Sequence, residues 1–447
     1  MKARFGLLMV LVAAGGRQAL AQDSVPPAER VIRVGITYTP GVRPGMLVLG
    51  GPRVQQLDSV RAILARDLDY SDRFEMITLP AEDNLALGIA EPADTNSGGT
   101  WSGTFVNYGL YAALGADYAV HVTLTRDSVL RVVVYDVRGE GVRREFAIPQ
   151  RDLPPPDFRL AVHRISDAVV RVTTGTPGTA ATRLLLLQLG RVYRVDSDGA
   201  DLVPVSPAGA KTFSPVWGPA GRSVAYTEFG GGGGRVYIQD VSSGARRLLA
   251  PTARHLNYTP AFSPDGRWLA FSRSSSDGTD IYTYDITADC CLQRLTVGRF
   301  SDNLSPTYSP DGRRIAFVST RPGLPQIYVM TADGTGQELL APFDYGMTGS
   351  SNAPEWSPDG LHLAFHRDVA GSPQVFVMDV ATRTVRQLTS AGRNEDPAWG
   401  PDGRHLAFVS NRTGNRQIWI IDLDTGRVRQ LTRLGDARLP AWSPRID

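Results

Sequence analysis

A turn with the sequence Ser-Pro-Asp-Gly recurs along the second half of this chain of 447 residues. The spacing of its copies limits the possible folds more than any other feature. Proline at its second position fixes φ, aspartate is tolerated at the third, and glycine closes a type I turn. The prolines recur at steps of 45, 46, 48, 43 and 43 residues. Such a period is typical of β-propeller blades. The copies are Ser263–Gly266, Ser309–Gly312, Ser357–Gly360, the looser Gly218–Gly221 and Gly400–Gly403, and the truncated Ser443–Pro444.

Each repeat contains four short apolar segments separated by polar loops. In one repeat, Ala353–Trp356 precedes the turn and Leu361–Phe365 follows it with alternating apolar residues. The third segment has the form of Gln326–Met330, and the outermost has the form of Arg386–Thr389. Short β-branched and aromatic runs bounded by Gly, Pro, Asn and Asp predict strands in hairpins. Four strands per repeat predict one propeller blade.

Strands outside the complete repeats predict how the ring closes. Five full repeats lie between Phe213 and Thr432, three predicted strands precede them, and Pro440–Pro444 follows them. Closure of a ring removes sheet edges that would otherwise invite aggregation. We therefore predict an α/β N-terminal domain followed by an all-β six-bladed β-propeller, whose last blade combines one C-terminal strand with three N-terminal ones. These three are Arg183–Leu187, Arg191–Val195 and Asp201–Val205.

Residues 1–21 have the order of a cleavable secretory signal, with basic residues first, then an apolar run, then the small residues Ala19–Ala21. The apolar run is too short to span a bilayer. Removing Lys2, Arg4 and Arg17 from the 47 basic residues leaves 44 against 45 acidic ones. A nearly neutral chain argues against a nucleic-acid partner. We expect an exported, periplasmic protein with a flexible segment at 22–30.

Residues 31–175 lack the repeat and mix helical with alternating patterns, which predicts a separate α/β domain. One helix is expected to end near Tyr70. A second is expected to run from an N-cap at Asp157 to Thr174, with Gly175 as its C-cap. The predicted strands are Val31–Ile36, Ala119–Leu124, Leu130–Val137 and Arg144–Ile148, the expected loop is 81–103, the linker is 176–181, and the propeller is 182–447.

The only cysteines are the neighbours Cys290 and Cys291. In an exported protein they meet an oxidising compartment. A strained ring between them, two free thiols and an intermolecular bond all remain open. None of these arrangements is a metal site with ligands at a useful spacing.

Several segments carry a family resemblance: Ile63–Phe74, Leu114–Asp117, His163–Asp167, Thr174–Arg183 and Pro440–Pro444. They resemble TolB, the periplasmic component of the Tol-Pal system of diderm bacteria. Many exported propellers share the Ser-Pro-Asp-Gly repeat, so the N-terminal domain carries most of the resemblance. Asp72 stands where the family favours Gly, and Ala180 stands where it favours an aromatic residue. Both departures indicate a distant member.

The resemblance implies a non-enzymatic adaptor that links an inner-membrane motor complex to an outer-membrane lipoprotein, supporting envelope integrity and cell division. The propeller would bind a Pal-type peptidoglycan-associated lipoprotein at one mouth of its channel. His255 and Asn257 match the family's binding loop, with one extra residue before Pro260. The mature N-terminus, Gln22–Arg30, would bind the inner-membrane protein TolA. A disordered tail is the alternative for this proline-broken segment.

The loops that end one repeat and begin the next inner strand are expected to reach one mouth of the channel. They are rich in Asn and Asp, which favour turns for purely local reasons. Gathered on one rim, however, they would form a polar ring able to hold a partner's side chains. Their carboxylates could also attract a divalent cation. The candidate partner-binding residues are His255, Asn257, Thr259, Asp302, Asn303, Ser305, Asn352, Asn394, Glu395 and Asp396, and the carboxylates in question are Asp302, Glu395 and Asp396.

The motifs that would indicate catalysis are incomplete, so we expect no catalytic residue and no cofactor. His362 and His366 lie on a predicted strand, where four residues span roughly 13 Å, too far for one metal ion. The chain has no Gly-x-Ser-x-Gly nucleophile elbow. The alternative function is an exported propeller enzyme of the peptidase type, or a glycan-binding protein, that uses the same mouth.

Overall fold

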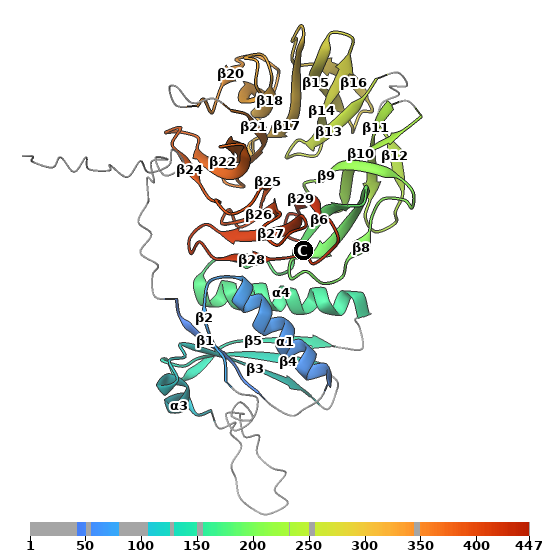
Figure 1. Cartoon of the computed structure of the whole chain (residues 1–447). Helices are drawn as coiled ribbons and strands as arrows, with labels where there is room; N and C mark the ends of the chain where they lie inside the picture. The colour runs from blue at the N-terminus through green and yellow to red at the C-terminus, as the bar shows by residue number, and fades with distance from the viewer. Residues whose placement is uncertain are drawn as a thin grey trace, which may run out of the picture.

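An α/β domain lies beneath a ring of small sheets in the computed structural model of the chain (Figure 1). The predicted signal, the flexible segment at 22–30, the strand Val31–Ile36 and the loop at 81–103 lie outside the described residues. The structure describes residues 43–50, 55–79, 106–125, 129–149, 155–231, 233–249, 255–343 and 349–446.

The N-terminal domain is a five-stranded sheet of order β2-β1-β3-β4-β5 with helices on both faces. β1 pairs in parallel with β2 and β3, and the remaining pairs are antiparallel. Side chains of α1 and α4 fill the core on one face, and α3 contributes to the core on the other. The elements are β1 Gly45–Val48, α1 Gln55–Tyr70, β2 Glu75–Ile77, α3 Tyr108–Ala113, β3 Tyr118–Leu124, β4 Val129–Asp136, β5 Gly141–Pro149 and α4 Pro155–Thr174.

The sequence prediction missed β1, β2 and α3, which are short. It also placed the start of the second helix wrongly. α4 begins at Pro155, two residues before the predicted N-cap Asp157, because proline suits the first helical turn, where its missing N–H is not needed. Its end is as predicted, since Gly175 has a φ of 81° and its N–H donates to the carbonyl of Arg171 at 2.9 Å. Within the described part of the chain, every helix falls short of the length or the hydrophobicity that a membrane span needs.

The repeated turn forms as predicted, and its serine holds it together. In the first full copy, the N–H of Gly266 donates to the carbonyl of Ser263 at 2.9 Å. The hydroxyl of Ser263 accepts the N–H of Trp268 at 2.8 Å and donates to the carboxylate of Asp265. Gly266 has a φ of 71°, a conformation that glycine adopts without steric cost. The turn therefore starts the second strand at a defined residue.

The strands that flank these turns form a β-propeller. They are, sheet by sheet, β6 Arg183–Gln188, β7 Arg191–Asp196 and β8 Val203–Pro204; β9 Lys211–Trp217, β10 Ser223–Gly230, β11 Gly233–Asp240 and β12 Arg246–Leu248; β13 Asn257–Phe262, β14 Trp268–Ser275, β15 Gly278–Asp285 and β16 Cys290–Arg294; β17 Ser301–Tyr308, β18 Arg314–Ser319, β19 Gln326–Thr331 and β20 Glu338–Leu339; β21 Ser351–Trp356, β22 His362–Val369, β23 Ser372–Asp379 and β24 Val385–Gln387; β25 Asn394–Trp399, β26 His405–Ser410, β27 Gln417–Asp422 and β28 Val428–Gln430; and β29 Arg438–Trp442.

These strands pair mostly within units of four. The sheets β9–β12, β21–β24 and β25–β28 are four-stranded and antiparallel, and β29 joins β6, β7 and β8 in a fourth such sheet. β13–β16 and β17–β20 merge into one eight-stranded sheet, because β15 pairs in parallel with β17 at Gly278–Ser301 and Thr279–Asp302. The outermost strands end earlier than predicted: β24 stops at Gln387 and β28 at Gln430.

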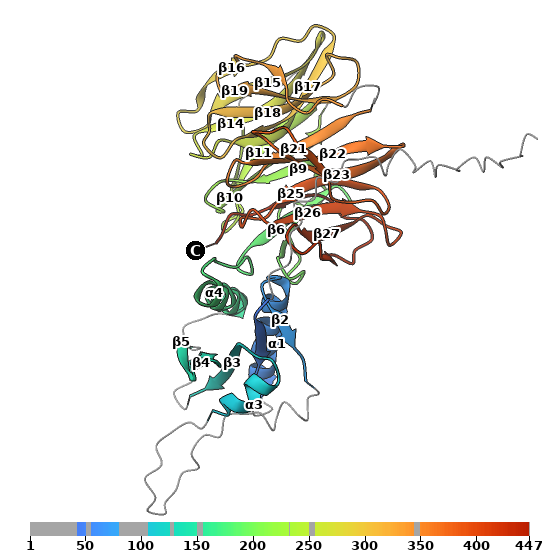
Figure 2. The same cartoon turned by 90° about the vertical axis from the view of Figure 1, so that its left-hand side faces the viewer.

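The cores of the ring lie between successive sheets. One buried cluster joins Ala316 and Ile327 to Phe365 of the next sheet. Another joins Leu185 of the β6–β8 sheet to Tyr226 of β10. In the described part of the ring, six such clusters each draw on two four-stranded units that follow one another. Each four-stranded unit therefore packs against the units before and after it. Figure 2 shows the ring from the side.

Replacing Ser309 by alanine should lower the free energy of unfolding by about 1–3 kcal/mol, since a buried hydrogen-bonding group is lost. The Ser309 side chain is buried, and its hydroxyl accepts the N–H of Arg314 at 3.0 Å. Urea unfolding followed by tryptophan fluorescence measures the change. The control is Ser276→Ala at an exposed turn, which should shift the value by less than about 0.5 kcal/mol. Equal shifts in the two variants would show that the serine does not hold the turn.

Candidate functional site

The inner strands of the ring each contain a β-bulge immediately before a proline. Thr259, Ser305 and Asp396 have φ values of 50°, 50° and 51°, and a proline follows each of them. Proline has no N–H to donate, so pairing with the second strand is interrupted and the register shifts there. Non-glycine residues keep this strained conformation only where their surroundings impose it. The same bulge occurs at Ser214, Ala353 and Leu439.

Three of the predicted site residues thus occupy one equivalent position, and two of them touch. The hydroxyl of Thr259 lies 2.7 Å from that of Ser272 and accepts the N–H of Ser305 at 3.3 Å. The N–H of Asp396 donates to Nδ1 of His366 at 3.1 Å. Burial raises the pKa of Asp396. The structure therefore brings Thr259 and Ser305 together and places Asp396 beside a histidine of its neighbouring sheet.

Three of the four predicted asparagines, which lie at or near the starts of inner strands, are buried. Asn257, Asn303 and Asn394 are 2%, 0% and 0% exposed. The amide of Asn257 donates to the carbonyl of His255 at 3.0 Å, and that of Asn394 donates to Gln374 Oε1 at 2.7 Å. These amides hold the mouth loops in shape. Their effect on a partner would therefore act through loop conformation.

The remaining predicted residues differ in their exposure and in their partners. Asp302 is exposed, while His255 and Asn352 are half-buried. Glu395 pairs with Arg393 at 3.2 Å and with Arg416 at 3.9 Å. The carboxylates predicted to attract a cation are thus spread over several loops.

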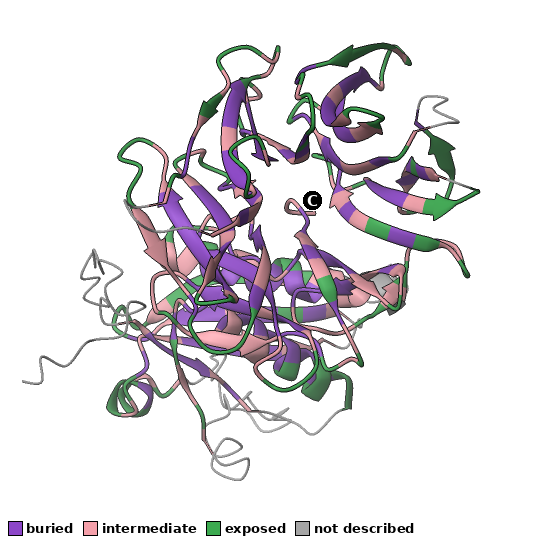
Figure 3. Ribbon diagram, turned by 45° about the horizontal axis from the view of Figure 1, so that its top comes forward, coloured by how far each residue is buried: buried purple, intermediate pink, exposed green. Residues whose placement is uncertain are grey.

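Exposed apolar side chains lie at the same end of the ring, a feature that the sequence analysis missed. Leu256, Val297 and Phe300 precede the inner strands β13 and β17, and Leu324 precedes β19. Their exposed fractions are 40%, 74%, 91% and 51%. Nothing in the residue pattern distinguishes them from buried leucines or phenylalanines, because exposure depends on what the fold leaves uncovered. We call these four residues the apolar rim. Figure 3 shows the ring with its buried strands and its exposed loops.

The opposite end of the ring packs on the N-terminal domain through charged groups that the sequence analysis did not single out. Arg404 donates to the carbonyl of Ser71, and Arg427 pairs with Asp69 at 2.7 Å and with Asp72 at 3.1 Å. The guanidinium of Arg429 lies over the ring of Tyr70, 4.0 Å from its centre. These arginines come from turns and strands at the end of β25–β28 that lies away from the mouth. We call this contact the domain junction.

His405 lies at the centre of the domain junction and is 1% exposed. Its Nδ1 lies 2.7 Å from Asp402, and its Nε2 lies 3.2 Å from Asp72 and 3.4 Å from Asp422. Burial opposes a charge on this ring, but the carboxylates outweigh burial and raise the pKa of His405. For Asp72, burial is likewise outweighed, here by His405 and Arg427, so its pKa is lowered. His405 therefore joins the two domains through its contact with Asp72.

A second cluster of charges lies where α4 meets the β7–β8 turn. Nδ1 of His163 lies 2.7 Å from Asp67 of α1. Arg159 and Arg66 both pair with Asp198, Arg159 at 2.6 Å. Burial opposes charge on His163, but Asp67 outweighs it and raises the pKa of His163.

The domain junction and the second cluster each contain a group of three His or Asp side chains whose ligand atoms lie within 4.8 Å of one another. Among the described residues these groups are Asp67, His163 and Asp198, and Asp72, His405 and Asp422. Neither contains a predicted mouth residue. Arginines already pair with Asp198, Asp72 and Asp422. We therefore assign both groups to the packing of the two domains.

Comparisons with known proteins agree on one family. The sequence profile described as the TolB beta propeller domain matches residues 173–344 and 345–447. A Tol-Pal system protein TolB from Albidiferax ferrireducens is 32% identical over 201 residues, 43% of this chain and 42% of the relative. The corresponding protein of Methylobacillus flagellatus is 31% identical over 257 residues, 56% and 51% of the two chains. These alignments span about half of each relative's length.

The fold extends the likeness to nearly the whole chain. The crystal structure of TolB from Acinetobacter baumannii has a TM-score of 0.73 with this structure and is 24% identical, covering 91% of this chain and 98% of that one. At this identity the likeness shows the fold alone.

Raising the pH above about 6.5 should weaken the domain junction. A group whose pKa is raised on folding stabilises the protein fully below its unfolded pKa, about 6.5 for histidine, and loses this effect as the pH rises through the folded value. Urea unfolding at several pH values should show the native protein losing stability over this range. The free energy of unfolding of the His405→Gln variant should be about 1–3 kcal/mol lower at the start of the series, and it should depend less on pH.

His121→Gln is the matched control for this pH series. Burial lowers the pKa of His121 to about 4, so this residue is neutral throughout the range, and its variant should keep the native pH slope. If the free energy of unfolding of His405→Gln fell with pH as steeply as that of the native protein, the assignment of the pH dependence to His405 would be contradicted.

Proposed function

Because the chain belongs to the TolB β-propeller family, we propose that it is a periplasmic, non-enzymatic adaptor of the Tol-Pal system. Its relatives carry the name Tol-Pal system protein TolB, which supports this system as its setting. In this proposal a Pal-type peptidoglycan-associated lipoprotein binds the propeller mouth. TolA binds the segment at 22–30, exposed once the signal at 1–21 is cleaved. Through these two contacts, the chain would connect the inner and outer membranes and support envelope integrity and cell division.

We infer that residues 182–447 form a closed ring of six blades, with β29 as the inner strand of the last blade. Three observations support closure. β29 pairs with β6, and each inner strand contacts the next, including β29 with β9. The turns also pack in sequence: a Cβ on Gly266 would lie 3.3 Å from Pro219, and one on Gly221 would lie 3.5 Å from Pro444. The N-terminal domain would comprise 31–175, joined by the linker 176–181.

The observation that carries the binding proposal is the difference between the two ends of the ring. The N-terminal domain covers the end with the turns that contain Arg404 and Arg427. β25 runs from the mouth to that end, so the loops that contain His255 and Phe300 lie at the end that the described residues of the N-terminal domain do not cover. Exposed apolar side chains that lie close to polar groups are typical of protein-binding surfaces. A bound divalent cation at Asp302, Glu395 and Asp396 stays a prediction.

Phe300→Ser should weaken capture of a Pal-type lipoprotein by about tenfold or more, as expected for an aromatic side chain central to an interface. The measurement is the affinity of the purified full chain for the lipoprotein's soluble domain. The matched control is Leu361→Ser, since Leu361 is 60% exposed but immediately precedes β22 at the opposite end of the ring. Its affinity should change by less than about twofold.

The predicted loop residues give a second test of the same mouth. His255→Ala together with Asn257→Ala should also weaken capture, Asn257 by loosening its loop. Capture of the lipoprotein at full affinity by both this double variant and Phe300→Ser would exclude the mouth as the binding surface. Failure of the native chain to bind would exclude the partner, and turnover of peptides or glycans in its place would favour the enzymatic alternative.

A further inference from the structure

One sheet of the ring has an extra residue in its outer hairpin. The interval from the last residue of the third strand to the leucine after the fourth is nine residues in two sheets, but ten in the sheet of β15 and β16. The extra residue falls at Cys290 and Cys291, where the register of β16 shifts between Thr283 and Asp285. Cys291 has a φ of 65°. The intervals compared are Asp379 to Leu388, Asp422 to Leu431 and Asp285 to Leu295.

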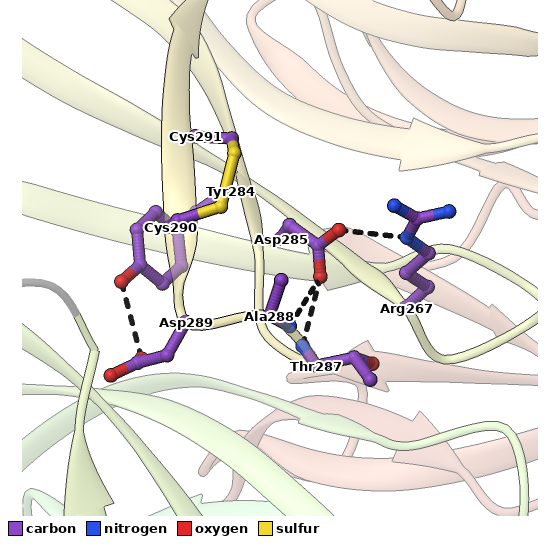
Figure 4. Close-up of a disulfide and its surroundings, with 8 residues drawn as sticks. All are labelled: Arg267, Tyr284, Asp285, Thr287, Ala288, Asp289, Cys290 and Cys291. Carbon is purple, nitrogen blue, oxygen red and sulfur yellow. Dashed lines mark hydrogen bonds and ion pairs between the residues drawn. A yellow bond between two sulfur atoms is a disulfide. The ribbon is translucent and has the colours of Figure 1, made fainter.

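The two cysteines form a disulfide with each other. Of the three arrangements that the sequence left open, the structure therefore has the disulfide between the two neighbouring cysteines. Cys291 is exposed, Cys290 is half-buried, and the remainder of β16 is exposed. β16 pairs only with β15, so its outer edge faces no other strand in the described part of the chain. Figure 4 shows the disulfide on this edge, beside Tyr284.

The turn before the disulfide is firmly held by hydrogen bonds. Asp285 accepts the N–H groups of Thr287 at 3.0 Å and Ala288 at 2.8 Å, and it pairs with Arg267 at 2.7 Å. The hydroxyl of Tyr284 donates to Asp289 at 3.1 Å (Figure 4). The bulge at Cys290 and Cys291 is thus the irregular point in an otherwise well-bonded hairpin.

The other end of β16 connects to the mouth. Arg294, the last residue of β16, donates to Asp280 through Nε at 3.1 Å. The same carboxylate accepts the amide of the buried Asn303 at 3.1 Å. In the corresponding position, another sheet uses the neutral Gln374, whose Oε1 accepts the amide of Asn394 at 2.7 Å. The position of β16 is therefore linked through one ion pair to a residue that shapes a mouth loop.

We propose that Cys290–Cys291 is a thiol–disulfide exchange site that a dithiol reductant opens under native conditions. Both its exposure and its place on an outer strand give a partner thiol access without unfolding of the ring. The exchange stands independently of the proposed function.

The exchange balances as a two-electron step. A thiolate of the reductant attacks Sγ of exposed Cys291, the S–S bond breaks, and Cys290 leaves as a thiolate that takes up a proton. The second thiol of the reductant then attacks the mixed disulfide and releases Cys291 as a thiol. Two cysteine thiols form, and the reductant becomes a cyclic disulfide. A disulfide oxidant reverses the step.

Breaking the Cys290–Cys291 disulfide removes the constraint on the bulge, so β16 can move relative to β15. We expect this movement to reach Asp280 through Arg294 and to loosen the hydrogen bond to Asn303. The redox state of the outer strand would thereby alter the mouth loop that begins β17.

The experiment uses the purified full chain, dithiothreitol as the dithiol, and maleimide labelling with intact mass. The native chain should accept no label, and after brief reduction it should accept a label at both cysteines. Amide exchange of the Cys290–Arg294 strand and of Asn303 should then become about tenfold faster. The hairpin of β24, Val385–Gln387, has a regular register and no cysteine, so its exchange should not change.

A double variant, Cys290→Ser with Cys291→Ser, separates the disulfide from the reductant. It should show the faster exchange in β16 without any dithiol and should not respond to dithiothreitol. Labelling before reduction, or reduction only in denaturant, would overturn the exchange site. Unchanged exchange at Asn303 in the reduced chain would overturn its link to the mouth.

Discussion

Every sheet of the ring has two apolar faces, and only its neighbouring sheets can cover them. The central strand residues Phe271, Phe317, Phe365 and Phe408 are essentially buried, although each sheet is only a few strands wide. Burial of such side chains drives folding, yet no sheet provides it alone. The stability of one blade therefore depends on the presence of the next. The Pro-to-Gly contacts between successive turns keep this packing in register.

This dependence leaves the two ends of the ring free to differ. At one end, His405, Arg404 and Arg427 meet carboxylates of the N-terminal domain, and buried charges of this kind require partners in well-defined positions. At the other end, prolines interrupt the inner strands, and the loops carry buried amides beside exposed apolar residues. One end thus packs on the N-terminal domain, and the other carries exposed apolar side chains.

The candidate site was only partly accessible to sequence reasoning. The loops around Asn257, Asn303 and Asn394 were found because they precede each inner strand. Their burial was not foreseen, since asparagine looks the same in an exposed turn and in a loop anchor. The repeated proline after Thr259, Ser305 and Asp396 was a visible signal of the bulges that the analysis did not use. The apolar rim and the domain junction left no signal, because their residues are far apart in the chain.

The sequence by itself determined the local structure of the ring. A Ser-Pro-Asp-Gly turn restricts its own backbone, and alternating apolar residues define which face of a strand is buried, so repeat length and most strands followed directly. It could not predict β1, β2 and α3, which are too short for periodicity and are held by their neighbours. Only the tertiary structure decided that Cys290 pairs with Cys291, that His405 meets Asp72, and which end of the ring packs on the N-terminal domain. These features depend on contacts between distant residues, and such contacts exist only after the chain has packed.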